Sequence, residues 1–248
     1  MRRLINLDTT ILEHPSLLFH GLFGTGKTYI LGDVLRSEAA NGPVRFINIK
    51  GEDGYLTLAH MGLGEVGEEV ENLTDLEAVI ADYAKLGLRA LGVDGLPHMS
   101  RLVIESVCGP EGVPRISKEQ NDWVPIHRRF EGLIRKLRWI APVFVATSST
   151  DRSMNQIDQE IWLTPDLAGK QATGVGGMFD FVFLCKTRQT GPGVTQRYLY
   201  TVASNTVVRA RLPRALPPQI VMPQGPGGWD VLKRAIEACL KPEGKNGG

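Results

Sequence analysis

The stretch that decides the fold is "SLLFHGLFGTGKTYI", residues 16–30. It begins as an apolar run, passes through three glycines and continues with helical spacing. Gly21, Gly26, Lys27 and Thr28 fit the pattern G-x-x-x-x-G-K-[ST], with a strand expected before it and a helix after it. Glycines let successive N–H groups point at phosphate oxygens, and a helix N-terminus adds about half a positive charge. The stretch therefore predicts a phosphate-binding loop.

The expected ligand of this loop is a nucleoside triphosphate with magnesium. Lys27 is expected to reach the β- and γ-phosphates, and the Thr28 hydroxyl is expected to bind Mg²⁺. No N-K-x-D pattern for reading guanine follows the later strands, which favours ATP. The residues expected to contact the nucleotide are Gly21, Leu22, Phe23, Gly24, Thr25, Gly26, Lys27, Thr28 and Tyr29.

Length and composition favour one reduced, cytoplasmic α/β domain. The 248 residues suit a single domain over residues 1–240, with a polar tail at 241–248. The 28 basic and 27 acidic residues give a net charge of +1, so any attraction to nucleic acid must be local. Three widely spaced cysteines suit neither a disulfide framework nor a zinc site. No apolar run approaches the length of a membrane span, so no membrane contact is expected.

Short apolar runs alternate with segments of helical periodicity, which predicts a mainly parallel sheet with helices on both faces. The expected strands are residues 17–20, 44–49, 90–93 and 143–147. The expected helices are residues 27–40, 74–86 and 126–140.

The pattern changes after about residue 179. The segments "FDFVFLCKTR", "TQRYLYTVA" and "TVVRARLP", joined by "QTGPG" and "SN", predict hairpins that extend the parallel core with antiparallel strands. "GGWDVLKRAIEACL" predicts a closing helix. Two stretches of weak periodicity, residues 95–125 and 148–178, are expected to be long functional loops.

Two carboxylates are expected near the phosphates. Asp94 directly follows a strand, where it can hold magnesium, although it can also be a simple turn residue. Glu52 follows another strand and is the favoured base for activating water, with Asp53 as the alternative. Thr147 ends a further strand, where its hydroxyl can sense the γ-phosphate or merely end the strand.

The order of these features resembles the core of RecA-type P-loop ATPases. More narrowly, "PDLAGKQATGVGGMFDFVFLCKTR" and "RYLYTVASNTVVRARLPRALPPQI" resemble phage RecA-like ATPases, including the Sak group of single-strand annealing proteins. The resemblance covers roughly residues 16–220. It implies a RecA-like fold, Mg²⁺-dependent ATP hydrolysis, and action on single-stranded DNA in phage recombination or annealing, in the host cytoplasm.

The resemblance also implies assembly. In hexameric relatives such as DnaB-type helicases, a K-x-R pair on a late strand reaches the ATP site of the neighbouring subunit. Arg209 and Arg211 stand at the corresponding place, with arginine replacing the usual lysine. They are therefore expected to act catalytically in a ring or filament with ATP sites between subunits. Two solvent-facing arginines on an exposed strand are the plainer alternative, and Lys170 is a weaker candidate for the same role.

In the RecA fold, DNA is bound by loops that correspond to the two long stretches. Their basic residues are expected to bind DNA: Arg101, Arg115, Lys118, Arg152 and Lys170. The segment "HRRFEGLIRKLR" is the densest basic cluster, but such a cluster is more often a solvated helix face. A DNA motor for unwinding or packaging, and a P-loop switch or kinase-like protein that does not act on DNA, remain the alternative functions.

Overall fold

The computed structural model describes residues 11–52, 54–110, 112–116, 121–154, 161–202, 206–212 and 214–240. Its strands are β1 (Ser16–Gly21), β2 (Val44–Ile49), β3 (Gly67–Val70), β4 (Ala90–Asp94), β5 (Val143–Met154), β6 (Ile161–Pro165), β7 (Phe181–Gly191), β8 (Val194–Tyr200), β9 (Arg209–Ala210) and β10 (Gln219–Met222). Its α-helices are α2 (Lys27–Glu38), α3 (Gly54–His60), α4 (Leu73–Tyr83), α5 (Leu96–Cys108), α6 (Trp123–Ile140), α7 (Gln171–Gly174) and α8 (Gly228–Leu240). Short 3₁₀ turns occupy Ala39–Asn41 (η1), Gly64–Val66 (η2) and Val175–Met178 (η3).

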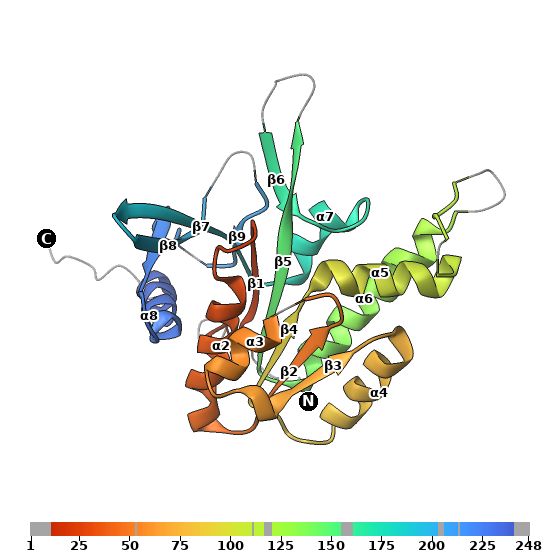
Figure 1. Cartoon of the computed structure of the whole chain (residues 1–248), viewed down its shortest axis with the longest axis horizontal. Helices are drawn as coiled ribbons and strands as arrows, with labels where there is room; N and C mark the ends of the chain where they lie inside the picture. Colours follow the sequence, from red (N-terminus) through yellow and green to blue (C-terminus); the bar gives the residue numbers. More distant parts are fainter. Residues whose placement is uncertain are drawn as a thin grey trace, which may run out of the picture.

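A ten-stranded sheet runs through the molecule in the order β10-β8-β7-β1-β5-β4-β2-β3, with β6 paired to β5 and β9 paired to β7 (Figure 1). The strands from β7 to β3 are parallel, and β8 and β10 extend the sheet with antiparallel pairing. The predicted fold class, a mainly parallel sheet with an antiparallel C-terminal extension, is confirmed.

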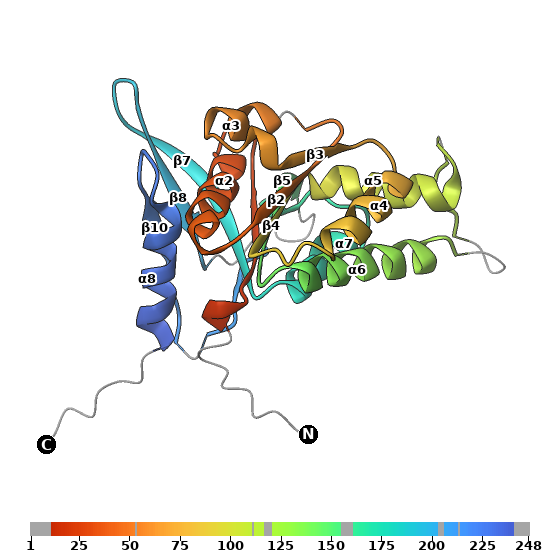
Figure 2. The ribbon, with the colours of Figure 1, turned by 90° about the horizontal axis from the view of Figure 1, so that it is seen from below.

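Helices cover both faces of the sheet, and each face has its own apolar cluster (Figure 2). Helices α4, α5 and α6 bury one face, where Leu76, Met99 and Phe130 are fully buried. Helices α2 and α8 bury the other face through residues such as Leu31 and Trp229. Within the described part of the chain, none of the helices has the length and hydrophobicity that crossing a lipid bilayer requires.

The prediction of two long loops is largely wrong. The stretch 95–125 contains α5 and the start of α6, and the stretch 148–178 contains the rest of β5, then β6, α7 and η3. Helix α5 was missed because Gly95 and Pro97 read as loop residues. Gly95 has a positive φ of 97° at the N-cap, and proline is compatible with the first turn of a helix. Behind them, Leu96, Met99 and Val103 have the spacing of a buried helix face.

The hairpin prediction is correct for β7 and β8 and wrong for the next segment. Strand β9 pairs with the start of β7, so "TVVRARLP" does not form a hairpin with β8. The partner of β8 on its other side is β10. The sequence-based reading also missed β3, which pairs with β2 through "GEEV", a segment without an apolar run.

Two buried carboxylates of α2 hold α8 against the sheet. Asp33 accepts hydrogen bonds from the backbone N–H groups of Gly227 (3.0 Å) and Trp229 (2.8 Å), at the start of α8. Glu38 accepts from Trp229 Nε1 and from Arg89 Nε, both at 2.7 Å, and also pairs with Lys233. Burial raises the pKa of Glu38, but hydrogen bonds from Lys233, Trp229 and Arg89 outweigh it and lower the pKa to about 2.

We expect Glu38→Gln to lower the free energy of unfolding by about 1.5–3 kcal/mol at pH 7, because it removes hydrogen bonds to a charged acceptor. The depressed pKa means that the contribution is complete above the usual value of 4.5 and is lost as the pH falls toward 2. Urea unfolding at several pH values measures the difference, with the exposed Glu237→Gln as control. A constant gap between Glu38→Gln and the wild type from pH 7 to pH 2 would contradict this account.

Candidate functional site

The phosphate loop joins β1 to α2 with the geometry that its glycines predict. Gly24 and Gly26 have φ angles of 75° and 84°, which side-chain-bearing residues rarely adopt. Thr25 Oγ1 donates to the carbonyl oxygen of Leu22 at 2.8 Å. Lys27 Nζ donates to the carbonyl oxygens of Gly21 (3.0 Å) and Leu22 (3.1 Å), so its charge lies against the loop itself. The loop can therefore present backbone N–H groups and one ammonium to phosphate.

Asp94 connects three elements at the carboxyl edge of the sheet. The Thr28 hydroxyl donates to Asp94 Oδ2 at 2.8 Å, and the Thr147 hydroxyl donates to Asp94 Oδ1. Thr147 Oγ1 also accepts from the N–H of Gly95 at 3.2 Å. Burial raises the pKa of Asp94, and the hydrogen bonds from Thr147 and Thr28 oppose that rise. The predicted sensor Thr147 thus holds the carboxylate, and its contact with a γ-phosphate stays a prediction.

The residues at this point fit magnesium. A hydroxyl and a carboxylate side by side are hard oxygen donors, and Mg²⁺ commonly takes one or two protein ligands besides phosphate and water. The oxygens of Thr28 and Asp94 are therefore the fitting protein ligands.

The segment after β2 is packed directly against Asp94. A Cβ atom on Gly54 would lie 1.8 Å from Asp94 Oδ2, and a Cβ atom on Gly95 would lie 2.6 Å from Glu52 Cγ. Glycine at both positions thus allows Glu52 to lie beside the end of β4. The alternative base, Asp53, lies outside the described residues.

Sequence reasoning missed His98. It lies in the first turn of α5, shortly after Asp94 at the end of β4. Its Nε2 lies 3.5 Å from Glu52 Oε1, and its ring packs against Gly51, whose φ is 104°. Burial is the largest cause of a lowered pKa at His98, followed by the charge of Arg101. The contact of His98 with Glu52 joins α5 to the segment after β2, so no local pattern in the sequence indicated it.

His20, just before the loop, ties β1 to two later segments. Its Nδ1 lies 3.0 Å from Thr150 Oγ1, and its Nε2 lies 2.8 Å from the carbonyl oxygen of Val207. Burial lowers the pKa of His20 to about 4, so the ring is neutral at pH 7. A neutral ring can donate from Nε2 to Val207 and accept from Thr150. The start of the loop is therefore fixed to β5 and to the chain that leads into β9.

Comparison with known proteins shows the fold. No protein-family model matches the chain, and no curated protein does. Among solved structures, a KaiC-like protein of the hyperthermophilic archaeon Pyrococcus horikoshii OT3 is similar, with a TM-score of 0.50 and 14% sequence identity. The match covers 87% of this chain and 88% of the other. The chain has a RecA-like fold.

The RecA-like fold places Arg209 and Arg211 at the edge of the sheet opposite the phosphate loop, because β9 pairs with the first residues of β7. Arg209 Nη1 donates to the carbonyl oxygen of Gly176 at 3.2 Å. Arg211 donates to the carbonyl oxygen of Gly177 at 2.9 Å and lies 3.4 Å from Asp180 Oδ1. Both arginines are thus bound within their own chain, and their action on a neighbouring subunit stays a prediction.

A second pair of cations matches the K-x-R pattern without departure. Lys186 and Arg188 are exposed on β7, just beyond Cys185, which pairs with Gly21 at the end of β1. The side chain of Lys186 lies over the ring of Tyr200 at 4.9 Å. Both residues belong to the β7–β8 hairpin, which projects past the ends of the neighbouring parallel strands (Figure 2). The pattern itself, K-T-R in the sequence, was the signal that could have identified them.

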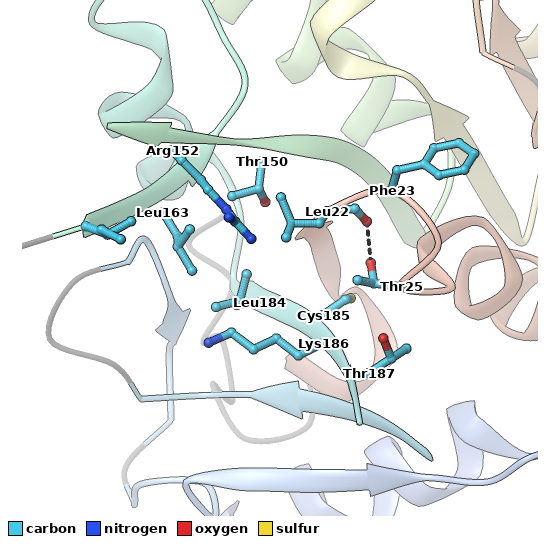
Figure 3. Close-up of a pocket in the computed structure, with 11 residues that line it drawn as sticks. Leu22, Phe23, Thr25, Thr150, Arg152, Leu163, Leu184, Cys185, Lys186 and Thr187 are labelled. Atoms are coloured by element: carbon cyan, nitrogen blue, oxygen red, sulfur yellow. Dashed lines mark hydrogen bonds between the residues drawn. The ribbon is translucent and has the colours of Figure 1, made fainter. Parts of the chain in front are cut away.

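A cavity of about 500 Å³ lies between this hairpin, the phosphate loop and the β5–β6 hairpin. Arg152 extends across it from β5, and Lys186 lies on the β7 side (Figure 3). Leu22 and Phe23 both line the cavity, and the ring of Phe23, which is 100% exposed, is directed away from the other lining side chains (Figure 3). None of the described residues that line the cavity is acidic.

The residues predicted to bind DNA lie on several elements, and their contact with DNA stays a prediction. Arg101, on α5, and Lys170, before α7, lie on elements joined by the Ser100–Gln171 hydrogen bond. Arg115 pairs with Asp122 near the start of α6. Arg152, on β5, lines the cavity beside the phosphate loop. Lys118 lies outside the described residues.

The two carboxylates predict two separable defects. Asp94→Asn should weaken nucleotide binding by at least about ten-fold in the presence of Mg²⁺, because it removes a charged oxygen ligand. Glu52→Gln should leave binding within about two-fold and lower turnover by about 10²–10⁴, the usual contribution of a general base. Titration of a fluorescent ATP analogue with Mg²⁺ or EDTA, followed by single-turnover hydrolysis, measures both.

Equal binding by the wild type and Asp94→Asn in Mg²⁺ would contradict the metal assignment. Wild-type turnover in Glu52→Gln would contradict the assignment of Glu52 as the base and favour the alternative base, Asp53.

Proposed function

We propose that the protein is a Mg²⁺-dependent ATPase that acts on single-stranded DNA as an assembly of identical subunits. The observation that carries the ATPase is the convergence of Lys27, Thr28, Asp94 and Glu52 at one edge of the sheet. The sequence resemblance to phage RecA-like proteins supports the finer role, strand annealing or recombination in the host cytoplasm.

In this proposal each residue has a distinct task. Lys27 and the loop N–H groups hold the phosphates and offset the charge that develops on them. Glu52 accepts the proton of the attacking water, and His98 beside it fixes the orientation of the carboxylate. Thr28 and Asp94 would hold a magnesium ion, which would neutralise charge on the phosphate oxygens.

The cation supplied to a neighbouring subunit is better assigned to Lys186 and Arg188 than to Arg211. Arg188 lies on a hairpin that projects past the sheet edge, whereas Arg211 is held by Gly177 and Asp180. Arg188 donates to the Tyr200 hydroxyl and lies over the ring of Tyr198 at 5.2 Å. These two tyrosines position the Arg188 side chain on the hairpin. A neighbour's arginine can raise phosphoryl-transfer rates by about 10³–10⁵.

Contact with single-stranded DNA is proposed through Arg152, Lys170 and Arg101. Arg152 and Leu22 of the phosphate loop line the same cavity. A change in the conformation of the loop on nucleotide binding could therefore alter the position of Arg152. The net charge of +1 means that a few local cations must supply the affinity, which should fall with salt by a slope of about 0.7 per phosphate contacted.

Two other functions fit parts of the same site. A DNA motor of the helicase or packaging type would use the same ATP site and the same neighbouring cations. A switch or kinase-like protein would use the loop alone, and its turnover would respond neither to DNA nor to protein concentration.

A mixing experiment tests the ATPase and its completion by a neighbour. Lys27→Ala and Arg188→Ala should each be nearly inactive alone, because one lacks the phosphate cation and the other lacks the cation supplied in trans. Mixed together, they should recover part of the wild-type turnover in assemblies that pair an intact loop with an intact hairpin.

Arg211→Ala mixed with Lys27→Ala tests, in the same assay, the sequence-based prediction that Arg211 acts on the neighbouring ATP site. The exposed Lys50→Ala is the control for loss of a lysine. Mixed assemblies that form without any recovery for either arginine would contradict catalysis in trans. Full activity of Lys27→Ala alone would contradict the assignment of the phosphate loop as the ATP site.

A further inference from the structure

Arg197, on β8, lies over the first turn of α2. Its guanidinium carbon is 4.5 Å from the centre of the Tyr29 ring. A Cβ atom built on Gly26 would lie only 2.6 Å from Arg197 Nε and 2.8 Å from its Cδ. Gly26 is the N-cap of α2, and Tyr29 follows Thr28 directly. This side chain therefore covers the same turn of helix that the phosphate loop presents to a ligand.

The position is unfavourable for a cation without an anion nearby. The N-terminus of a helix carries partial positive charge, so a guanidinium against it is repelled. The Nη1 atom of Arg197 is also buried and has no hydrogen-bond partner among the described residues. Buried N–H groups are almost always paired, so an unpaired one needs an explanation. An anion at this turn would remove both penalties.

The space for a water molecule beside Arg197 is small. A small cavity beside Arg197, between Tyr29, Asp33 and Met222, has a volume of only about 10 Å³. That volume is at the lower limit for one water molecule. Asp33 is already engaged by the N–H groups of Gly227 and Trp229.

The register of the hairpin explains why Arg197 faces its own loop. Arg197 is paired with Thr187, whereas Lys186 pairs with Tyr198 and Arg188 with Gln196. Because directly paired residues share a face and successive residues alternate, Arg197 lies on the face opposite Lys186 and Arg188. One face of the hairpin thus turns toward the phosphate loop of the same subunit.

We propose that Arg197 is a second cationic ligand for the phosphate groups of the bound nucleotide, supplied by the same chain and positioned by the ring of Tyr29. The inference rests on the proposed function and adds a residue to that site. Arg197 and Lys27 bracket the loop, with Lys27 against Gly21 and Leu22 and Arg197 against Gly26. A guanidinium can donate two parallel hydrogen bonds to phosphate, which an ammonium cannot.

Binding of inorganic tripolyphosphate to the full chain tests the proposal, because this probe has no base or ribose. Calorimetry with Mg²⁺ should show that Arg197→Gln weakens tripolyphosphate binding by about ten- to hundred-fold. Arg197→Lys should recover part of the loss, and Tyr29→Leu should weaken binding less than Arg197→Gln because it only loosens the arginine. Arg234→Gln, an exposed arginine of α8, is the control.

The outcomes separate this inference from the proposed function. Tight tripolyphosphate binding that Lys27→Ala weakens and Arg197→Gln leaves unchanged, with a lowered melting temperature in Arg197→Gln, would make Arg197 a structural residue and overturn the inference alone. Absence of both tripolyphosphate and ATP binding in the folded wild type would overturn the proposed function, and the inference with it.

Discussion

The buried carboxylate of Asp94 is the interaction on which the site depends. It is 2% exposed, and a carboxylate so far from water needs hydrogen-bond donors or a cation to remain charged. Thr28 and Thr147 supply the donors, and they come from α2 and β5, so one carboxylate fixes the phosphate loop, β4 and β5 in a single arrangement. The glycines at 54 and 95 leave the space that this arrangement requires. Loss of any of these contacts would displace the groups that must meet at the phosphates.

The β7–β8 hairpin places further cations beside the phosphate loop. It extends the sheet past the phosphate loop, and strand alternation puts cations on both of its faces. Lys186 and Arg188 are exposed on one face of the hairpin, and Arg197 packs against Gly26 of the phosphate loop from the other face. In the proposed assembly, one hairpin would therefore contact both the ATP site of its own subunit and that of a neighbour. No acidic residue occurs in the sequence from residue 181 to residue 229, so nothing in this extension offsets its positive charge locally.

The parts of this structure that local patterns encode were predictable. The phosphate loop has a motif of fixed spacing, and β1, β2, β4 and the first half of β5 carry short apolar runs. Helix α5 was hidden by a glycine and a proline that begin a helix as readily as they interrupt one. The K-x-R pattern occurs at residues 186–188 as well as in altered form at 209–211, and sequence order alone did not decide between them.

Other features depend on packing between distant segments. The pairing of β9 with β7, the contact of His98 with Glu52, and the stacking of Arg197 on Tyr29 join residues that no local pattern connects. His20 is a similar case, since its partners lie 130 and 187 residues away in the chain. Such contacts could be found only once the order and register of the strands were known.

The most direct test of the account is ATP turnover per subunit, measured over a wide range of protein concentrations, with and without a single-stranded oligonucleotide. The sites are proposed to be completed between subunits and coupled to DNA, so turnover per subunit should rise with concentration and rise again with the single strand, but not with a duplex of equal length. Turnover that is measurable yet independent of both concentration and DNA would contradict the account and favour a P-loop switch that works alone.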